Sequence, residues 1–375
     1  MNNSYRMLII SIIIFFNISV TSAFSLPEPN ESEISLDSYI FSNRMLVSFS
    51  NRINPLSASQ KEEKKKFFSA LANGNAYNPQ FSYKSFSDKL EQFALSEENI
   101  EAKGFFAQKL QESLLSLRTQ AKMLLPNDAA MFTNLSKQIY PAPDNTLVLE
   151  AWRIVKEMKL DEDEKSISPN DLKSILEQAL KDYSLDDWQV EIAADMSARA
   201  SVSPASCKVK ISSSAMFSSE DAKRLTLHEI GVHAQRAHYG KKMPLKIFTT
   251  GLPGYLETEE GLAVYNEYRN GINAGLPLFA MRVLGVHWAL KHSFFNTFKL
   301  LKNLGASDDI AWRITTRCKR GLKDTSKAGA YTKDVSYLRG FIKIKNLMKE
   351  SPLLFEKLLK AGKVGVGDIM SGGLD

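Results

Sequence analysis

The sequence predicts a helix-rich α+β protein, and three observations carry this prediction. Several long segments place apolar residues three or four positions apart, which is the pattern of amphipathic helices. Three short runs, at 188–192, 198–203 and 207–212, alternate apolar and polar residues as half-buried strands do. A histidine-rich segment with helical features, 225–240, follows the last of these runs.

The first 23 residues have the features of a signal peptide. Arg6 supplies a short basic region, Met7 to Val20 form an apolar run, and 21–23 offer small residues for cleavage. The apolar run is shorter than the ~20 residues that a membrane-spanning helix needs. We therefore expect an exported protein, periplasmic or secreted, with no stable membrane span after signal cleavage; an uncleaved N-terminal anchor is the alternative. Residues 24–44 are rich in proline and acidic residues, which predicts a loose linker.

The length of 375 residues and an apolar content of 44% allow a sizeable hydrophobic core. These values argue against a disordered chain. The sequence also lacks the fixed period that a repeat protein would show. Helical patterns over 58–72, 85–122 and 146–159 predict a helical N-terminal subdomain at 45–160. We expect the catalytic domain to follow at 161–370.

The strand-like runs and the segment after them predict a hairpin followed by a helix. The turn Ser203-Pro-Ala-Ser206 separates two of the alternating runs, as a hairpin loop would. Ser218 and Asp221 have the spacing of a capping box at a helix start, and Gly240 suits the helix end. We expect these short strands to be antiparallel. Strands followed directly by a histidine-bearing helix are the order found in zincin-like metallopeptidases.

His228, Glu229 and His233 form the motif HExxxH within that helix. In the shorter HExxH motif, two histidines one turn apart bind zinc and the glutamate acts as general base. Residues five apart diverge by roughly 140° on an ideal α-helix, so both rings could not meet one metal. We therefore predict a π-like turn centred near Gly231.

A third ligand is predicted from the segment YLETEEGLAVY, which places Glu259 and Glu260 near a helix start that Thr258 could cap. Two histidines and a distant carboxylate leave one position on zinc open, as catalytic sites do. Glu260 shares its helical face with apolar residues and is the favoured ligand. His238, at about 280° from His228, points away from the other two histidines and is excluded.

HEIGVH followed by EEGLA resembles the family known in bacteria as QEGLA-motif proteins and in animals as microtubule-associated tyrosine carboxypeptidases. Segments such as YNPQF and YTKDVSYLRG extend the resemblance over about residues 45 to 350. The resemblance implies a Zn²⁺-dependent metallopeptidase that removes a C-terminal tyrosine. It also implies His228, His233 and Glu260 as metal ligands and Glu229 as the general base. This chain departs from the family motif at Glu259, which replaces glutamine.

A carboxypeptidase also needs a cation for the terminal carboxylate of its substrate. The candidates for substrate binding are Arg317, Arg320, Lys333 and Tyr331, all from the segment that resembles the family. The stretch from Arg282 to Lys363 holds 18 Lys/Arg and six Asp/Glu, a balance that would suit an acidic peptide or protein C-terminal tail. Lysine-rich outer helix faces explain the same balance, and no nucleic-acid partner is expected.

Two other functions stay open at this point. A zinc endopeptidase would use the same metal ligands, and a basic exported binding protein would use none of them catalytically. Measuring the metal content would distinguish the binding protein from an enzyme. Distinguishing an exopeptidase from an endopeptidase requires substrates with a free or a blocked C-terminal carboxylate. Cys207 and Cys318 permit at most one disulfide, and their separation gives no reason to expect it.

Overall fold

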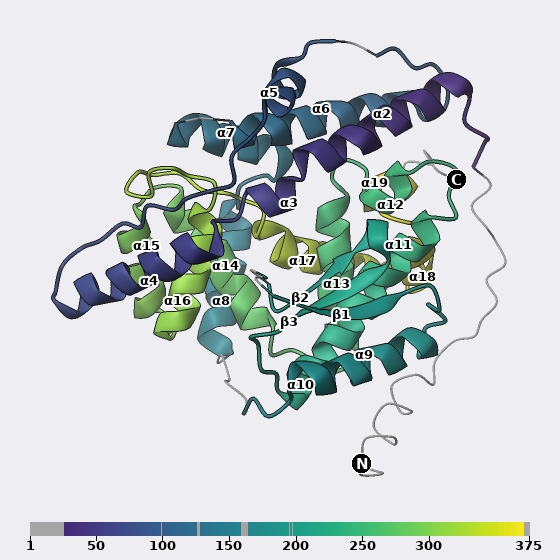
Figure 1. The fold of residues 1–375 in the computed structure, drawn as a ribbon. Helices are drawn as coiled ribbons and strands as arrows, with labels where there is room; N and C mark the ends of the chain where they lie inside the picture. Colours follow the sequence, from purple (N-terminus) through teal and green to yellow (C-terminus); the bar gives the residue numbers. More distant parts are fainter. Residues whose placement is uncertain are drawn as a thin grey trace.

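A computed structural model of the chain describes residues 26–98, 100–125, 128–158, 164–194, 196 and 198–370. The prediction of a helix-rich α+β protein is confirmed, because many helices surround a small three-stranded sheet (Figure 1). The predicted signal peptide lies outside the described residues. Within them, no helix is both long enough and apolar enough to cross a membrane.

The expectation of a loose linker over 24–44 is wrong from Glu31 onward, because helix α2 (Glu31–Val47) begins there. Asn30 and Glu33 form a capping box, in which each side chain accepts from the other residue's backbone amide. Asp37, 2% exposed, accepts hydrogen bonds from two backbone amides at the start of the distant helix α12. The polar residues that suggested a linker therefore cap α2 or, in the case of Asp37, connect α2 to α12.

The upper group of helices in Figure 1 forms one layer over the rest of the molecule. Its buried side chains share a hydrophobic cluster with three short helices from later in the chain. The layer consists of α2, α3 (Phe49–Arg52), α5 (Asp88–Leu95), α6 (Ala107–Leu124) and α7 (Ala129–Ile139), and the later helices are α12 (Ile247–Thr250), α18 (Leu354–Lys360) and α19 (Val366–Met370).

The helix predicted over 85–122 is interrupted between α5 and α6. Gly104 adopts φ +138°, a backbone region that favours glycine. The backbone amide of Phe106 donates to Glu33 of α2 over 2.6 Å. Helix α5 already ends at Leu95, and this tertiary contact fixes the chain just before α6, within the stretch that periodicity alone would have made helical.

A second group of helices, at the left of Figure 1, surrounds an aromatic cluster. Phe67 contacts the rings of Phe294, Phe298 and Trp312 with centroid separations of 4.8 to 5.4 Å. The helices predicted at 58–72 and 146–159 are confirmed here to within two residues. The group consists of α4 (Ser57–Ala72), α8 (Asn145–Glu157), α14 (Leu276–Ala289), α15 (Phe294–Asn303) and α16 (Asp308–Lys319).

Both hydrophobic clusters draw residues from either side of the predicted domain boundary at residue 160. Helices α4 and α8 from the N-terminal side pack with α14, α15 and α16 from the C-terminal side. The division into 45–160 and 161–370 therefore stays a prediction, and packing joins the two parts closely.

The sheet contains the three predicted strands, in the order β1-β3-β2. The predicted hairpin is confirmed: β2 (Ala200–Ser203) and β3 (Lys208–Ser212) pair antiparallel around the short helix η1 (Pro204–Ser206). The expectation that all strands are antiparallel is wrong, since β1 (Gln189–Ala193) pairs parallel with β3. Alternation fixes which face of a strand is buried but not the direction of its neighbour. Helices α9 (Pro169–Asp182) and α10 (Ser219–Leu225) share the hydrophobic cluster under the sheet.

Helices α13 (Tyr255–Arg269) and α17 (Val335–Glu350) pack against each other through the middle of the molecule (Figure 1). Their backbones touch at two glycines: a β-carbon on Gly340 would lie 2.0 Å from the carbonyl oxygen of Glu257, and one on Gly261 would lie 2.4 Å from the backbone of Gly340. This close approach fixes α13 next to α17, and α13 carries the predicted ligand Glu260.

Candidate metal centre

The histidine-bearing helix contains the predicted π-type segment. Helix α10 begins with the predicted capping box of Ser218 and Asp221, and it continues into the π-helix η2 (Thr226–Ala234) and then α11 (Gln235–Gly240). A β-carbon on Gly231 would lie 2.8 Å from the side-chain amide of Asn266. A larger residue at position 231 would displace the Asn266 side chain of α13. Glycine at this position also makes the wide π-type turn easier to form.

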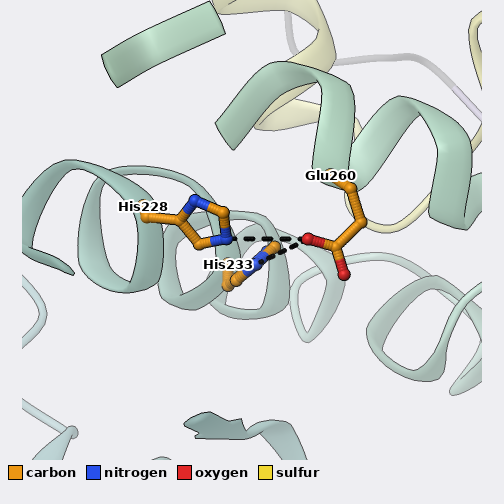
Figure 2. A group of neighbouring side chains, drawn as sticks. All are labelled: His228, His233 and Glu260. Carbon is orange, nitrogen blue, oxygen red and sulfur yellow. Dashed lines mark ion pairs between the residues drawn. The ribbon is translucent and has the colours of Figure 1, made fainter. Parts of the chain in front are cut away.

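The wide turn brings His228 and His233 together opposite Glu260 (Figure 2). Their ring centroids are 4.7 Å apart. Each Nε2 atom lies 3.6 Å from the same carboxylate oxygen, Glu260 Oε2. One ligand atom from each of the three residues lies within 4.8 Å of the other two. Tetrahedral zinc ligands at about 2.0–2.2 Å from the metal are roughly 3.3–3.6 Å apart, which matches this arrangement.

The chemistry of the donor set fits a cation. Glu260 Oε2 is fully buried and has no hydrogen-bond partner among the described residues. A separation of 3.6 Å is too long for a hydrogen bond to either imidazole. Such a buried carboxylate oxygen is costly unless a positive charge compensates it. Burial lowers the pKa of His228, but Glu260 and Glu267 outweigh burial and raise it to about 10. A metal cation between the three side chains would supply the missing charge.

Two further carboxylates orient the imidazoles. His228 Nδ1 lies 2.6 Å from Glu267 Oε1, and His233 Nδ1 lies 2.9 Å from Glu259 Oε1. A carboxylate accepts from a protonated Nδ1, which leaves the Nε2 lone pair directed at Glu260. Sequence reasoning missed both roles. Glu267 lies seven residues after Glu260, two turns along the same helical face, and this spacing could have indicated it.

Glu259 also belongs to a buried charge network. It is 2% exposed and forms ion pairs with Arg236 and Lys363. Burial raises its pKa, but the charges of Lys363, Arg236 and His233 outweigh burial and hold that pKa well below its usual range. The carboxylate therefore stays ionised and can keep His233 in one orientation.

The expected cap of α13 is wrong. The helix begins at Tyr255, after Gly254 in the left-handed conformation with φ 78°, so Thr258 lies inside it. Thr258 Oγ1 accepts a hydrogen bond from the backbone amide of Val366 instead. The acidic pair therefore lies in the second turn of the helix, where it is buried.

Glu229, the predicted general base, lies beside the first histidine in η2 and is 8% exposed. In the part of the chain that the structure describes, its carboxylate forms no hydrogen bond or ion pair. The carboxylate is therefore not engaged by any other described residue.

The predicted substrate-binding cations gather around Asp334, which is 1% exposed. Arg317 donates to both carboxylate oxygens of Asp334 through Nε and Nη2. Arg320 donates to Asn54 over 2.9 Å and lies 3.5 Å from Asp334. Both arginines therefore already have hydrogen-bond acceptors within the protein. The sequence alone does not reveal these acceptors, because folding brings them close.

Lys333 and Tyr331 differ from these arginines. Lys333 is half-buried and has no hydrogen bond or ion pair with any described residue. Burial lowers its pKa, although the nearby carboxylate of Glu260 acts in the opposite direction. Tyr331 is 2% exposed and packs its ring 4.8 Å from the guanidinium of Arg320. The tyrosine thus packs against the arginine cluster, whereas the lysine is influenced by the charge of the candidate ligand Glu260.

The third histidine of this helical segment and the two cysteines lie apart from the site. His238, excluded as a ligand by its spacing, is 3.3 Å from Asp187 and does not converge with the triad. Cys207 and Cys318 are both free.

Fold and site together define a class: an α+β protein in which two histidines and one glutamate converge as a candidate metal centre. A family model described as microtubule-associated tyrosine carboxypeptidase matches residues 65–371. The chain belongs to this family, which confirms the resemblance inferred from HEIGVH and EEGLA.

Curated relatives carry the same description over a shorter alignment. Microtubule-associated tyrosine carboxypeptidase 1 of Rattus norvegicus is 32% identical over 147 residues, which are 38% of this chain and 31% of the relative. The Homo sapiens protein of that name is 32% identical over 146 residues, with the same shares. The aligned part of the chain thus spans just under a third of these relatives.

Proposed function

We propose that this protein is a zinc-dependent carboxypeptidase that removes a C-terminal aromatic residue, tyrosine-like, from peptide or protein tails. The observation that carries the proposal is the convergence of His228, His233 and Glu260 on one point, beside an unpartnered Glu229. Relatives named as tyrosine carboxypeptidases support the class of reaction.

Each residue of the site has a role in this proposal. His228, His233 and Glu260 would hold Zn²⁺, which supplies Lewis acidity that activates water and polarises the scissile carbonyl. Glu229 accepts the proton of the attacking water and returns it to the leaving amine. The carboxylates of Glu267 and Glu259 keep the imidazoles of His228 and His233 directed at the metal position while the charge at the site changes during the reaction.

An exopeptidase must also bind a free carboxylate, and the cluster around Asp334 supports this requirement. The guanidinium groups of Arg282, Arg317 and Arg320 lie within 4.0 Å of its single carboxylate, so positive charge exceeds negative charge there. Lys333 forms no hydrogen bond or ion pair with any described residue, and the charge of Glu260 acts to raise its pKa. A positive surface next to the triad suits a terminal carboxylate and, further along the peptide, acidic side chains.

The substrate's location belongs to the proposal as well. The leader at 1–23 predicts export, so we place the activity in the periplasm or outside the cell, on the C-terminal tail of a peptide or protein there. No feature of the site favours nucleic acid.

The test compares two peptides that end in Glu-Glu-Tyr, one with a free carboxylate and one amidated, using purified protein with measured zinc content. We expect stoichiometric zinc, loss of tyrosine from the free acid, and little cleavage of the amide. Glu229→Gln should retain zinc but lose the activity, because only the proton acceptor is removed. Equal cleavage of both peptides, or cuts at internal bonds, would indicate an endopeptidase; a protein without zinc or hydrolysis would indicate a binding protein.

A further inference from the structure

One arginine near the site, Arg282, forms no hydrogen bond with any described residue. Arg282 of α14 approaches the cluster around Asp334, but its Nε lies 4.0 Å from Asp334 Oδ2, too far for a hydrogen bond. Its Nε atom is fully buried without a partner in the described part of the chain. The side chain is 15% exposed. A buried guanidinium without an acceptor is costly unless a ligand supplies one.

Two aromatic rings hold this guanidinium in place. Phe279 and Tyr337 stack with centroids 5.0 Å apart and an interplanar angle of 8°. The guanidinium carbon of Arg282 lies 5.3 Å from the centroid of Phe279 and 4.9 Å from that of Tyr337. Cation–π contacts of this kind orient a guanidinium without occupying its N–H donors. The donors of Arg282 are therefore fixed in position and still available.

The same rings connect Arg282 to the metal centre. Tyr337 lies one turn before Gly340 on α17, and Gly340 contacts the backbone of Gly261, the residue that follows Glu260. The ring of Tyr337 also contacts Arg282. Helix α14 packs against α17, so the two elements hold this geometry rigidly.

Positive groups outnumber the carboxylate at Asp334. Arg282, Arg317 and Arg320 each lie within 4.0 Å of it, and Lys333 precedes it in the chain. Arg317 and Arg320 have hydrogen-bonded acceptors, whereas Arg282 and Lys333 have none among the described residues. A carboxylate matches the forked N–H geometry of a guanidinium.

We propose that Arg282, assisted by Lys333, binds the terminal carboxylate of the substrate. This inference rests on the proposed function, and it assigns a receptor that differs from Arg317 and Arg320, which position Asp334. Arg282 lies on α14, and Lys333 lies in the turn that precedes α17.

The test measures binding in the Glu229→Gln background, so that the peptide is not consumed. Titration calorimetry compares a tyrosine-ending peptide with its C-terminal amide in three variants and the background protein. We expect the background protein to prefer the free acid about ten- to a hundredfold, the range for a charge-assisted hydrogen bond. Arg282→Gln should reduce this preference to within about twofold. Arg313→Gln, an exposed arginine on neighbouring α16, should leave it unchanged.

The outcomes separate this inference from the proposed function. If the background protein binds both peptides equally, the exopeptidase function and this receptor are both wrong. If it prefers the acid and Arg282→Gln keeps the full preference, only the assignment of Arg282 is wrong. Should Arg282→Gln fail to fold, Arg282→Lys decides the question: it keeps the charge but loses the fork, and an undiminished preference for the acid would overturn the proposal.

Discussion

The contact between α13 and α17 can be tested by adding one methyl group at Gly340. In Gly340→Ala the new β-carbon would lie 2.0 Å from the backbone carbonyl oxygen of Glu257. Carbon–oxygen contacts between neighbouring backbones are normally at least about 3.3 Å, so the helices must separate by roughly 1.3 Å. No side-chain rotation relieves this clash, because both atoms belong to the helix backbones. Since α13 carries Glu259, Glu260 and Glu267, the shift would reach the metal centre.

The expected destabilisation is about 3 kcal/mol, the upper part of the range for overpacking a core. Replacing glycine by alanine inside a helix would by itself stabilise the protein by up to about 1 kcal/mol, which offsets part of this loss. The melting temperature, followed by circular dichroism, should fall by at least about 5 °C. Zinc affinity, measured by chelator competition, should fall roughly tenfold, as for other changes that misplace metal ligands.

Gly367→Ala in α19 is the matched control, because a β-carbon there would meet no atom within 4 Å. It should melt at the same temperature as the parent protein or slightly above. If Gly340→Ala and Gly367→Ala show the same melting temperature and zinc affinity, the close contact of α13 with α17 does not position Glu260 and our reasoning is wrong.

Three other changes test the neighbouring contacts. Glu267→Gln should weaken zinc binding about 10- to 100-fold by removing the carboxylate that orients His228; unchanged affinity in chelator competition would contradict that role. Gly231→Val should lower both stability and metal content, since the β-carbon meets Asn266 and a β-branched side chain resists the π-type turn; a parent-like melting curve would argue against it. Lys319→Met should cost about 3 kcal/mol in denaturant unfolding, because Lys319 Nζ lies within hydrogen-bond distance, 2.6 to 3.0 Å, of four backbone carbonyl oxygens that its three N–H donors serve. Lys323→Met serves as the surface control, and equal losses in the two lysine variants would refute the prediction.

Local chemistry explains which parts of the fold the sequence could predict. The capping box of Ser218 and Asp221 involves atoms three residues apart, and the hairpin of β2 and β3 is closed by a short turn. The π-type turn followed from spacing, because two histidines five residues apart can meet one metal only if the helix widens. Each of these features depends on neighbours along the chain, so the residues themselves contain the information.

Tertiary contacts decided the features that the sequence analysis missed. Helix α2 is stable because its acidic residues cap it and contact backbone amides about two hundred residues away. The parallel pairing of β1 with β3 depends on the path between strands, which alternation does not encode. Gly104 interrupts a periodic helical run where the chain must meet Glu33.

The candidate site shows the same division. The sequence by itself determined the identity of the converging groups, since HExxxH and EEGLA supply two imidazoles, a base and a carboxylate. Only the tertiary structure decided which carboxylates orient the imidazoles and which cations remain available. Glu259 is neutralised by Arg236 and Lys363, and Arg317 by Asp334, whereas Glu260 Oε2 and Arg282 Nε have no hydrogen-bond partner among the described residues. Whether a buried charge is compensated depends on residues brought close by folding, because electrostatic interactions act through space rather than along the chain.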